Sequence, residues 1–200
     1  MGSVIRNNSF RWLIVGAVLI IVLSVSIIIN KVNRDESSKI HYVKNANQIG
    51  PGILSMKDST LANIHLGDSQ EKVIQMMGDP DETGVLHGTP YPYFIYNKQS
   101  VTVAFYKAGS SPQEPVGGVV EVTINGDSGF QTDKGIGIGA SLNDIIKAYG
   151  DVYVNSDKSN VWINGIESKE VNRIKYYPPQ LQMLLLDGKI VRIEMVNVPL

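Results

Sequence analysis

The sequence predicts an α+β fold in which an N-terminal transmembrane helix precedes two tandem repeats, each a short helix packed on an antiparallel β-meander. A long uncharged segment, a repeated helix-forming segment and the strand-like segments after each copy predict this fold. The two copies, 64–79 and 136–151, align without a gap at a constant offset, since 139 − 67 = 72 and 150 − 78 = 72. A period of this length indicates a duplicated structural unit.

The N-terminal part of the chain divides into a tail (1–11), an anchor (12–30) and a linker (31–58). No residue from Trp12 to Ile29 is charged, and a helix of this length spans about 27 Å, close to the hydrocarbon thickness of a bilayer. A cleaved signal peptide is the alternative, but the segment ends without the small residues of a cleavage site, so we expect a retained signal anchor. Basic residues flank both sides of the anchor. Its short tail favours a cytoplasmic N-terminus and a C-terminal domain outside the cytoplasm.

Each repeat, the first at 59–127 and the second at 128–200, opens with a predicted short helix. The signals are the same in both copies: a glycine, a Ser N-cap, an apolar helical face and a glycine that ends the helix. The residues that carry them are Gly67, Ser69, Gly78 and Pro80 in the first copy and Gly139, Ser141 and Gly150 in the second. Asp144 stands where it can complete a capping box with Ser141, whereas Lys72 cannot do so for Ser69.

Strand-like segments follow each predicted helix, identified by β-branched and aromatic residues and by intervening turn signals. These segments are 93–96, 101–106 and 119–124 after the first helix, and 173–177, 181–186 and 190–195 after the second. In the last segment, Arg192 and Glu194 alternate with Ile193 and Met195, which predicts one wet face and one buried face. Because a unit of this size is marginally stable alone, we expect the two repeats to pack together.

The helix motif, followed by an aromatic strand and two more strands, resembles the SmpA/OmlA-like modules of outer-membrane assembly lipoproteins. Tandem copies resemble the architecture of the β-lactamase inhibitor protein. The resemblance covers about residues 62–198 and is carried by Gly67, Ser69, Val73, Gly78, Pro80 and Tyr96 in the first copy and by Gly139, Ser141, Ile145, Gly150 and Tyr176 in the second. The chain departs from the pattern in having no lipobox Cys and in having Val152 at the place of Pro80. The resemblance implies a bacterial surface module that binds proteins through its sheet and loops, with no catalytic residues.

Several strings of residues imitate catalytic motifs. Gly67-Asp68-Ser69 resembles the nucleophile block of one esterase class, but no histidine of the chain follows an aspartate by three residues to activate the serine. Gly126-Asp127-Ser128-Gly129 imitates a serine-protease block and suits a turn between the repeats. The glycines at 135–139 lack the βαβ context of a dinucleotide site. We therefore predict no catalytic residues and no cofactor.

Metal and nucleic-acid sites are also disfavoured. The chain has no cysteine and 3 histidines without metal-like spacing, which excludes a thiolate or zinc site; a weak surface cation site at 79–84 stays an alternative. With 18 basic and 19 acidic residues, the formal net charge is −1, and no basic stripe indicates nucleic-acid binding.

Amphipathic aromatic side chains are the remaining candidates for function. Tyr93, Tyr96, Trp162 and Tyr176 are the predicted binding residues, because such rings anchor protein partners when they are exposed. Trp162 could equally be a core residue. We expect a membrane-anchored, non-catalytic adaptor or inhibitor that binds a protein of the cell envelope. The alternatives are a cell-envelope hydrolase and a glycan-binding stalk.

Overall fold

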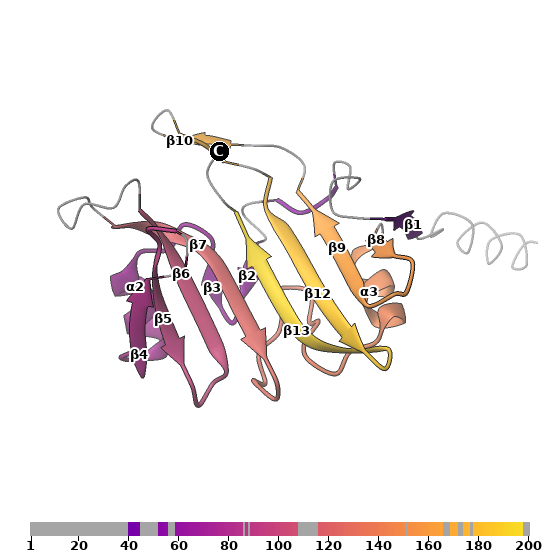
Figure 1. Cartoon of the computed structure of the whole chain (residues 1–200), viewed down its shortest axis with the longest axis horizontal. Coiled ribbons are helices and arrows are strands. Elements are labelled where there is room, and N and C mark those ends of the chain that lie inside the picture. Colours follow the sequence, from indigo (N-terminus) through magenta and orange to yellow (C-terminus); the bar gives the residue numbers. More distant parts are fainter. Residues whose placement is uncertain are drawn as a thin grey trace, which may run out of the picture. The chain divides into compact units, whose positions relative to one another are not determined.

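The computed structural model describes residues 40–44, 52–55, 59–85, 87, 89–107, 116–150, 152–165, 169–171, 174–176 and 178–197. All of them belong to one compact unit, 38–200. A nine-stranded sheet dominates this unit, and two short helices lie against one of its faces (Figure 1).

The strands of the large sheet run in the order β1-β8-β9-β12-β13-β7-β6-β5-β4. From one edge to the other they are β1 (Ile40–Val43), β8 (Val152–Asn155), β9 (Asn160–Asn164), β12 (Gln180–Leu186), β13 (Lys189–Val196), β7 (Val116–Asn125), β6 (Val101–Lys107), β5 (Pro92–Tyr96) and β4 (Glu82–Val85). β1 is parallel to β8, and every other neighbouring pair is antiparallel. Two small hairpins complete the described strands: β2 (Thr60–Leu61) with β3 (Ile64–His65), and β10 (Lys169–Val171) with β11 (Ile174–Tyr176).

The predicted fold class is wrong. The protein is mainly β, and nine of its described strands form one mixed sheet instead of two tandem helix-on-meander repeats. The pairing of β7 with β13, from Asn125↔Arg192 to Glu121↔Val196, joins the two halves of the chain. It satisfies backbone groups that would be unpaired at the edges of two separate sheets.

The two helices are α2 (Gln70–Met77) and α3 (Leu142–Tyr149). Ser69 and Ser141 are their N-caps, as the sequence predicts. Gly78 and Gly150 end them in the positive-φ region, at φ 84° and 77°, which only glycine adopts without strain. The predicted helix starts and stops are therefore confirmed.

The glycine before each helix ties the helix to the sheet. Gly67 N–H donates to Val119 O of β7, and Gly139 N–H donates to Ile190 O of β13, each at 2.8 Å. Both glycines have positive φ, 92° and 85°, so the chain turns sharply into the helix at these points.

The hydrophobic core lies between the helices and the sheet. Val73 of α2 and Ile145 and Tyr149 of α3 are buried there. The strands contribute alternate residues, among them the fully buried Val103, Val122, Met183 and Ile193. Both helices lie on the same side of the sheet (Figure 1), and within the described residues no helix covers the opposite side.

The predicted membrane-spanning helix also needs correction. Among the described residues, no helix is long and apolar enough to cross a membrane. Residues 12–30 themselves lie outside the described part of the chain. The predicted transmembrane anchor is therefore without support from the structure.

Candidate functional site: the open face of the sheet

The side of the nine-stranded sheet opposite α2 and α3, which we call the open face, carries the candidate site. One row of its side chains runs in register across all strands: Glu82, Ile95, Thr102, Thr123, Glu194, Gln182, Trp162, Tyr153 and His41. Successive side chains of a strand point to opposite faces. Since the next residue along each central strand, such as Val122 or Ile193, belongs to the core, this row faces away from it.

One end of the open face holds three rings in register, which we call the aromatic row. Trp162 lies between the core residues Val161 and Ile163 and therefore points to the open face, where it is only 6% exposed. Tyr153 is its cross-strand partner in β8. His41 of β1 stacks on Tyr153, with ring centroids 4.9 Å apart and planes at 25°. Aromatic cross-strand pairs of this kind stabilise the pairing of neighbouring strands.

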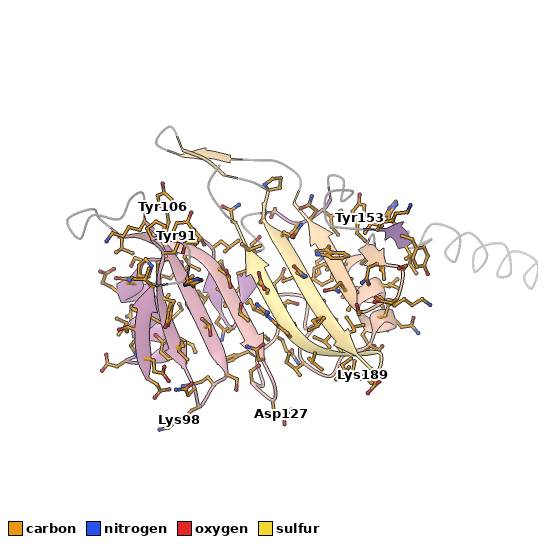
Figure 2. The ribbon with its side chains drawn as sticks, in the orientation of Figure 1. Tyr91, Lys98, Tyr106, Asp127, Tyr153 and Lys189 are labelled. Carbon is orange, nitrogen blue, oxygen red and sulfur yellow. The ribbon has the colours of Figure 1, made fainter. Side chains whose placement is uncertain are left out.

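The other end of the face is also aromatic. The rings of Tyr91 and Tyr106 lie 5.8 Å apart at 56° (Figure 2). Tyr93 of β5 is the cross-strand partner of Gly84 in β4, and its ring covers that glycine so closely that a Cβ there would lie 2.5 Å from the Tyr93 hydroxyl oxygen. Gly84 thus leaves the space that the Tyr93 ring fills.

Charged groups occupy the centre of the face. Arg192 Nη2 lies 2.6 Å from Glu194 Oε2, on β13. On the neighbouring β7, Thr123 Oγ1 donates to Glu121 Oε1 at 3.1 Å. Burial, and secondly the charge of Glu121, raise the pKa of Glu194, and Arg192 lowers it by less. We call Glu121 and Glu194 the central acid pair.

Two leucines stand beside these charges. Leu184 and Leu186 of β12 alternate with the buried Leu185, so both point to the open face, where they are 38% and 63% exposed. Leu184 is the cross-strand partner of Arg192 on one side and of Asn160 on the other. An isolated exposed leucine is ordinary, but two on one strand beside a partly buried ion pair form an apolar patch. We call them the leucine pair.

The structure separates the predicted binding residues. Tyr93 and Trp162 lie on the open face, at opposite ends. Tyr96 lies on the core side of β5, 1% exposed, and its hydroxyl donates to Gly78 O at 3.2 Å, so it fastens the end of α2 to the sheet. Tyr176 lies in β11, and its side chain is outside the described part of the structure.

The charged and apolar groups of the face were not among the predicted binding residues. For Glu121 and Glu194 a signal existed, because each is a charged residue that alternates with buried apolar neighbours in its strand. For the leucine pair there was none. The run Leu184-Leu185-Leu186 contains no alternation of polarity, and pairing with β13 shifts register between Leu184 and Leu185.

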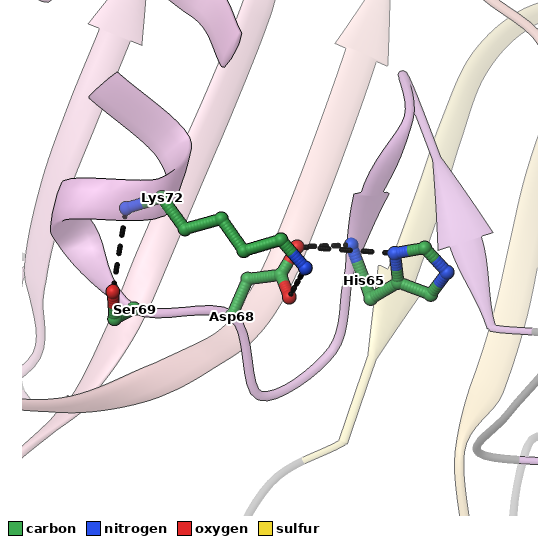
Figure 3. Close-up of polar contacts among 4 residues, drawn as sticks. All are labelled: His65, Asp68, Ser69 and Lys72. Carbon is green, nitrogen blue, oxygen red and sulfur yellow. Dashed lines mark hydrogen bonds and ion pairs between the residues drawn. The ribbon is translucent and has the colours of Figure 1, made fainter. Parts of the chain in front are cut away.

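The esterase-like block Gly67-Asp68-Ser69 has a structural role in the turn before α2. Asp68 is 8% exposed and accepts from His65 N–H at 3.0 Å and from Lys72 Nζ at 2.7 Å. Ser69 Oγ accepts from Lys72 N–H at 3.3 Å and so caps the helix. In Figure 3 the His65 ring lies on the far side of the Asp68 carboxylate from Ser69, and no hydrogen bond or ion pair joins the ring to the hydroxyl. The Ser69 hydroxyl instead bonds to the Glu71 carboxylate in the first turn of the helix, and this hydrogen bond lowers the pKa of that carboxyl.

The other segments that imitate functional motifs also make structural hydrogen bonds. Ser128 Oγ accepts from Phe130 N–H at 3.3 Å. In the acidic segment before β5, Asp81 accepts from Asn97 N–H at 2.8 Å and Glu82 from the Asn97 side chain at 2.9 Å. Within the described residues, no group of three or more His, Cys, Asp or Glu side chains could hold a metal ion.

In comparisons with known proteins, no family model, no curated protein and no solved structure matches the chain. The resemblance to SmpA/OmlA-like modules therefore stays a prediction.

Proposed function

We propose that this chain is a non-catalytic protein-binding module whose open sheet face is the docking surface. The observation that carries the proposal is the leucine pair, which exposes apolar surface at the β12–β13 hairpin end of a face that also presents charged and aromatic groups. A surface of this composition suits a protein partner, since protein interfaces combine apolar and aromatic anchors with a polar surround.

The architecture supports the same function. The central groups of the face, among them Glu194 and Trp162, stand on strands whose alternate residues belong to the core, so they are held in place before a partner arrives. Anchors that are already ordered lose little conformational entropy on binding. The module would act as an adaptor or an inhibitor, and its placement in the cell envelope derives from the sequence resemblance alone.

Site-specific photo-crosslinking tests the proposal. A benzophenone amino acid replaces Leu186 on the open face, and in a matched control it replaces Met76 on α2, which is 40% exposed on the helix side of the sheet. After irradiation in an extract of the producing cells, we expect a discrete protein adduct from position 186 and none from position 76.

The captured protein is then purified and titrated against the intact chain. Leu184→Asp and Leu186→Asp should each weaken binding about tenfold or more, because each places a charge in the apolar patch. Equal crosslinking from positions 76 and 186, or affinity that neither aspartate changes, would contradict an open-face docking surface.

A further inference from the structure

The charges of the open face are unbalanced. Its described strands carry three carboxylates, those of Glu82, Glu121 and Glu194, and the guanidinium group of Arg192. Lys189, at the turn between β12 and β13, is the cross-strand partner of Leu186, so its side chain is a second cation of this face, at the hairpin end of the strand and away from Glu121. The open face is therefore acidic, and its acidity concentrates in the central acid pair.

Within the described residues, one member of the central acid pair has an ion-pair partner and the other has none. Glu194 is the cross-strand partner of Thr123, and Glu121 lies two residues from Thr123 on the same strand, so the two glutamates are diagonal neighbours. Such neighbours are separated by about 7–8 Å between Cα atoms, close enough for one cationic group to reach both carboxylates. Arg192 pairs with Glu194, whereas Glu121 receives the neutral hydroxyl of Thr123, and no cationic side chain of the described residues pairs with it.

Two adjacent carboxylates in a partly buried position repel each other, and a second cation would remove this repulsion. The groups around the pair favour a particular kind of cation. The leucine pair, adjoining Arg192, offers apolar surface to the methylene stem of a long basic side chain and to an apolar neighbour. A hydrated metal ion would use none of this apolar surface.

We infer that the partner docks on the open face through a basic segment, placing an arginine or lysine side chain between Glu121 and Glu194 and an apolar side chain on Leu184 and Leu186. Arginine suits the position better than lysine, because its planar group donates several hydrogen bonds and can bind two carboxylates at once. The inference rests on the proposed function and adds the chemistry of the partner.

A random dodecapeptide library displayed on phage and selected against the intact chain tests the inference. We expect the enriched peptides to share an arginine or lysine next to an apolar residue. A synthetic copy of the most enriched peptide should bind about tenfold or more weakly to Glu121→Gln and to Glu194→Gln, and more weakly as salt concentration rises. Glu71→Gln, which removes an exposed carboxylate from α2 on the helix side, is the matched control and should leave the affinity unchanged.

Arg192→Gln should change the affinity for the peptide in the opposite direction. It removes the internal competitor for the central acid pair, so the same peptide should bind more tightly than it binds the original chain. Thermal unfolding of each variant shows whether the fold persists, and the glutamine substitutions preserve side-chain shape.

The outcomes separate this inference from the proposed function. Peptides that Leu186→Asp displaces but that show no basic preference would overturn the inference and leave open-face docking intact. If no enriched peptide is sensitive to Leu186→Asp, both fail. A basic preference that survives Glu121→Gln and Glu194→Gln would also overturn the inference, since the cation would then bind elsewhere.

Discussion

The carboxyl group of Glu194 sits where its negative charge is unfavourable. Burial and the neighbouring Glu121 raise its pKa above the ordinary value of 4.5, despite the ion pair with Arg192. A raised pKa means that the folded state binds the proton more readily than the unfolded state does. The resulting stabilisation is fully present below the unfolded pKa and is lost as the pH rises through the folded pKa.

Replacement of this carboxyl group should therefore stabilise the protein at neutral pH. We expect Glu194→Gln to raise the free energy of unfolding relative to the original chain near pH 7, and the gain to disappear below the ordinary carboxyl pKa. Urea denaturation followed by circular dichroism at the two pH values measures both quantities. A loss of stability at neutral pH would show that the ion pair with Arg192 outweighs burial and repulsion, and a gain independent of pH would show that ionisation of Glu194 is not its cause.

For Trp162 and Tyr93, the environment of the side chain could not be predicted from the neighbouring residues in the sequence. The sequence leaves Trp162 open between partner contact and core residue, because its neighbours on both sides are apolar. In the structure it faces away from the core and is still buried. Tyr93 is half-buried, and its environment depends on Gly84, a strand partner that no local pattern reveals.

The helices are the elements that the sequence predicts best, because their signals are local. A serine and the backbone three residues ahead are always within reach of each other, whatever the remainder of the chain does. The structure adds a difference between the two caps. At α3, Asp144 Oδ2 accepts from Ser141 N–H at 2.8 Å while Ser141 Oγ accepts from Asp144 N–H at 3.3 Å, forming the capping box that Lys72 cannot form at α2.

The two caps should differ in their contribution to stability. Ser141→Ala removes the Oγ that accepts from Asp144 N–H and donates to Asp144 Oδ2, and keeps only the backbone N–H bond to that carboxylate. We expect it to cost about 1 kcal/mol or more, and Ser69→Ala to cost less. Hydrogen bonds from Ser141 lower the pKa of Asp144, and this stabilisation exists above the unfolded pKa and is lost as the pH falls through the folded pKa. Urea titrations at neutral and acidic pH should show the excess cost of Ser141→Ala shrinking in acid. Equal costs for the two variants at neutral pH would mean that the box adds nothing to the simple cap.

Local sequence signals predict some of the strands and miss others. The predicted segments correspond to β5, β6, β7, β11, β12 and β13, which have recognisable β-branched and aromatic runs. β1 comes from a segment that the sequence assigns to a linker. Its only partner in the described structure is β8, far along the chain and parallel, so nothing near residues 40–43 indicates a strand. Asn160–Asn164 resembles a loop tip in the sequence because asparagines flank it, yet it forms β9 between two partners.

The continuity of the sheet is the property that the sequence conceals most completely. A repeated motif indicates two units, but whether the units keep separate sheets depends on whether β7 pairs with β13. No periodic pattern in the sequence of either strand indicates this pairing. In the structure their five register pairs make one sheet, and one core cluster contains residues of both halves, including Phe105 and Ile193. The open face, and with it the proposed site, exists only because the two halves share this sheet.

A shared sheet and core should unfold as one cooperative unit, and Trp162 can report it. The chain has 2 tryptophans, so Trp12→Phe leaves Trp162, in the second half, as the only one.

Phe105 lies in the first half, fully buried, with its ring 4.8 Å from that of Phe94. Phe105→Ala should cost about 3–5 kcal/mol. Because the halves are coupled, the urea midpoint from Trp162 fluorescence should fall as far as the midpoint from far-ultraviolet circular dichroism. Met183→Ala, in the second half, provides the reciprocal control. Two separate repeats would instead leave the Trp162 transition unmoved by Phe105→Ala, and the circular dichroism curve would split into two steps.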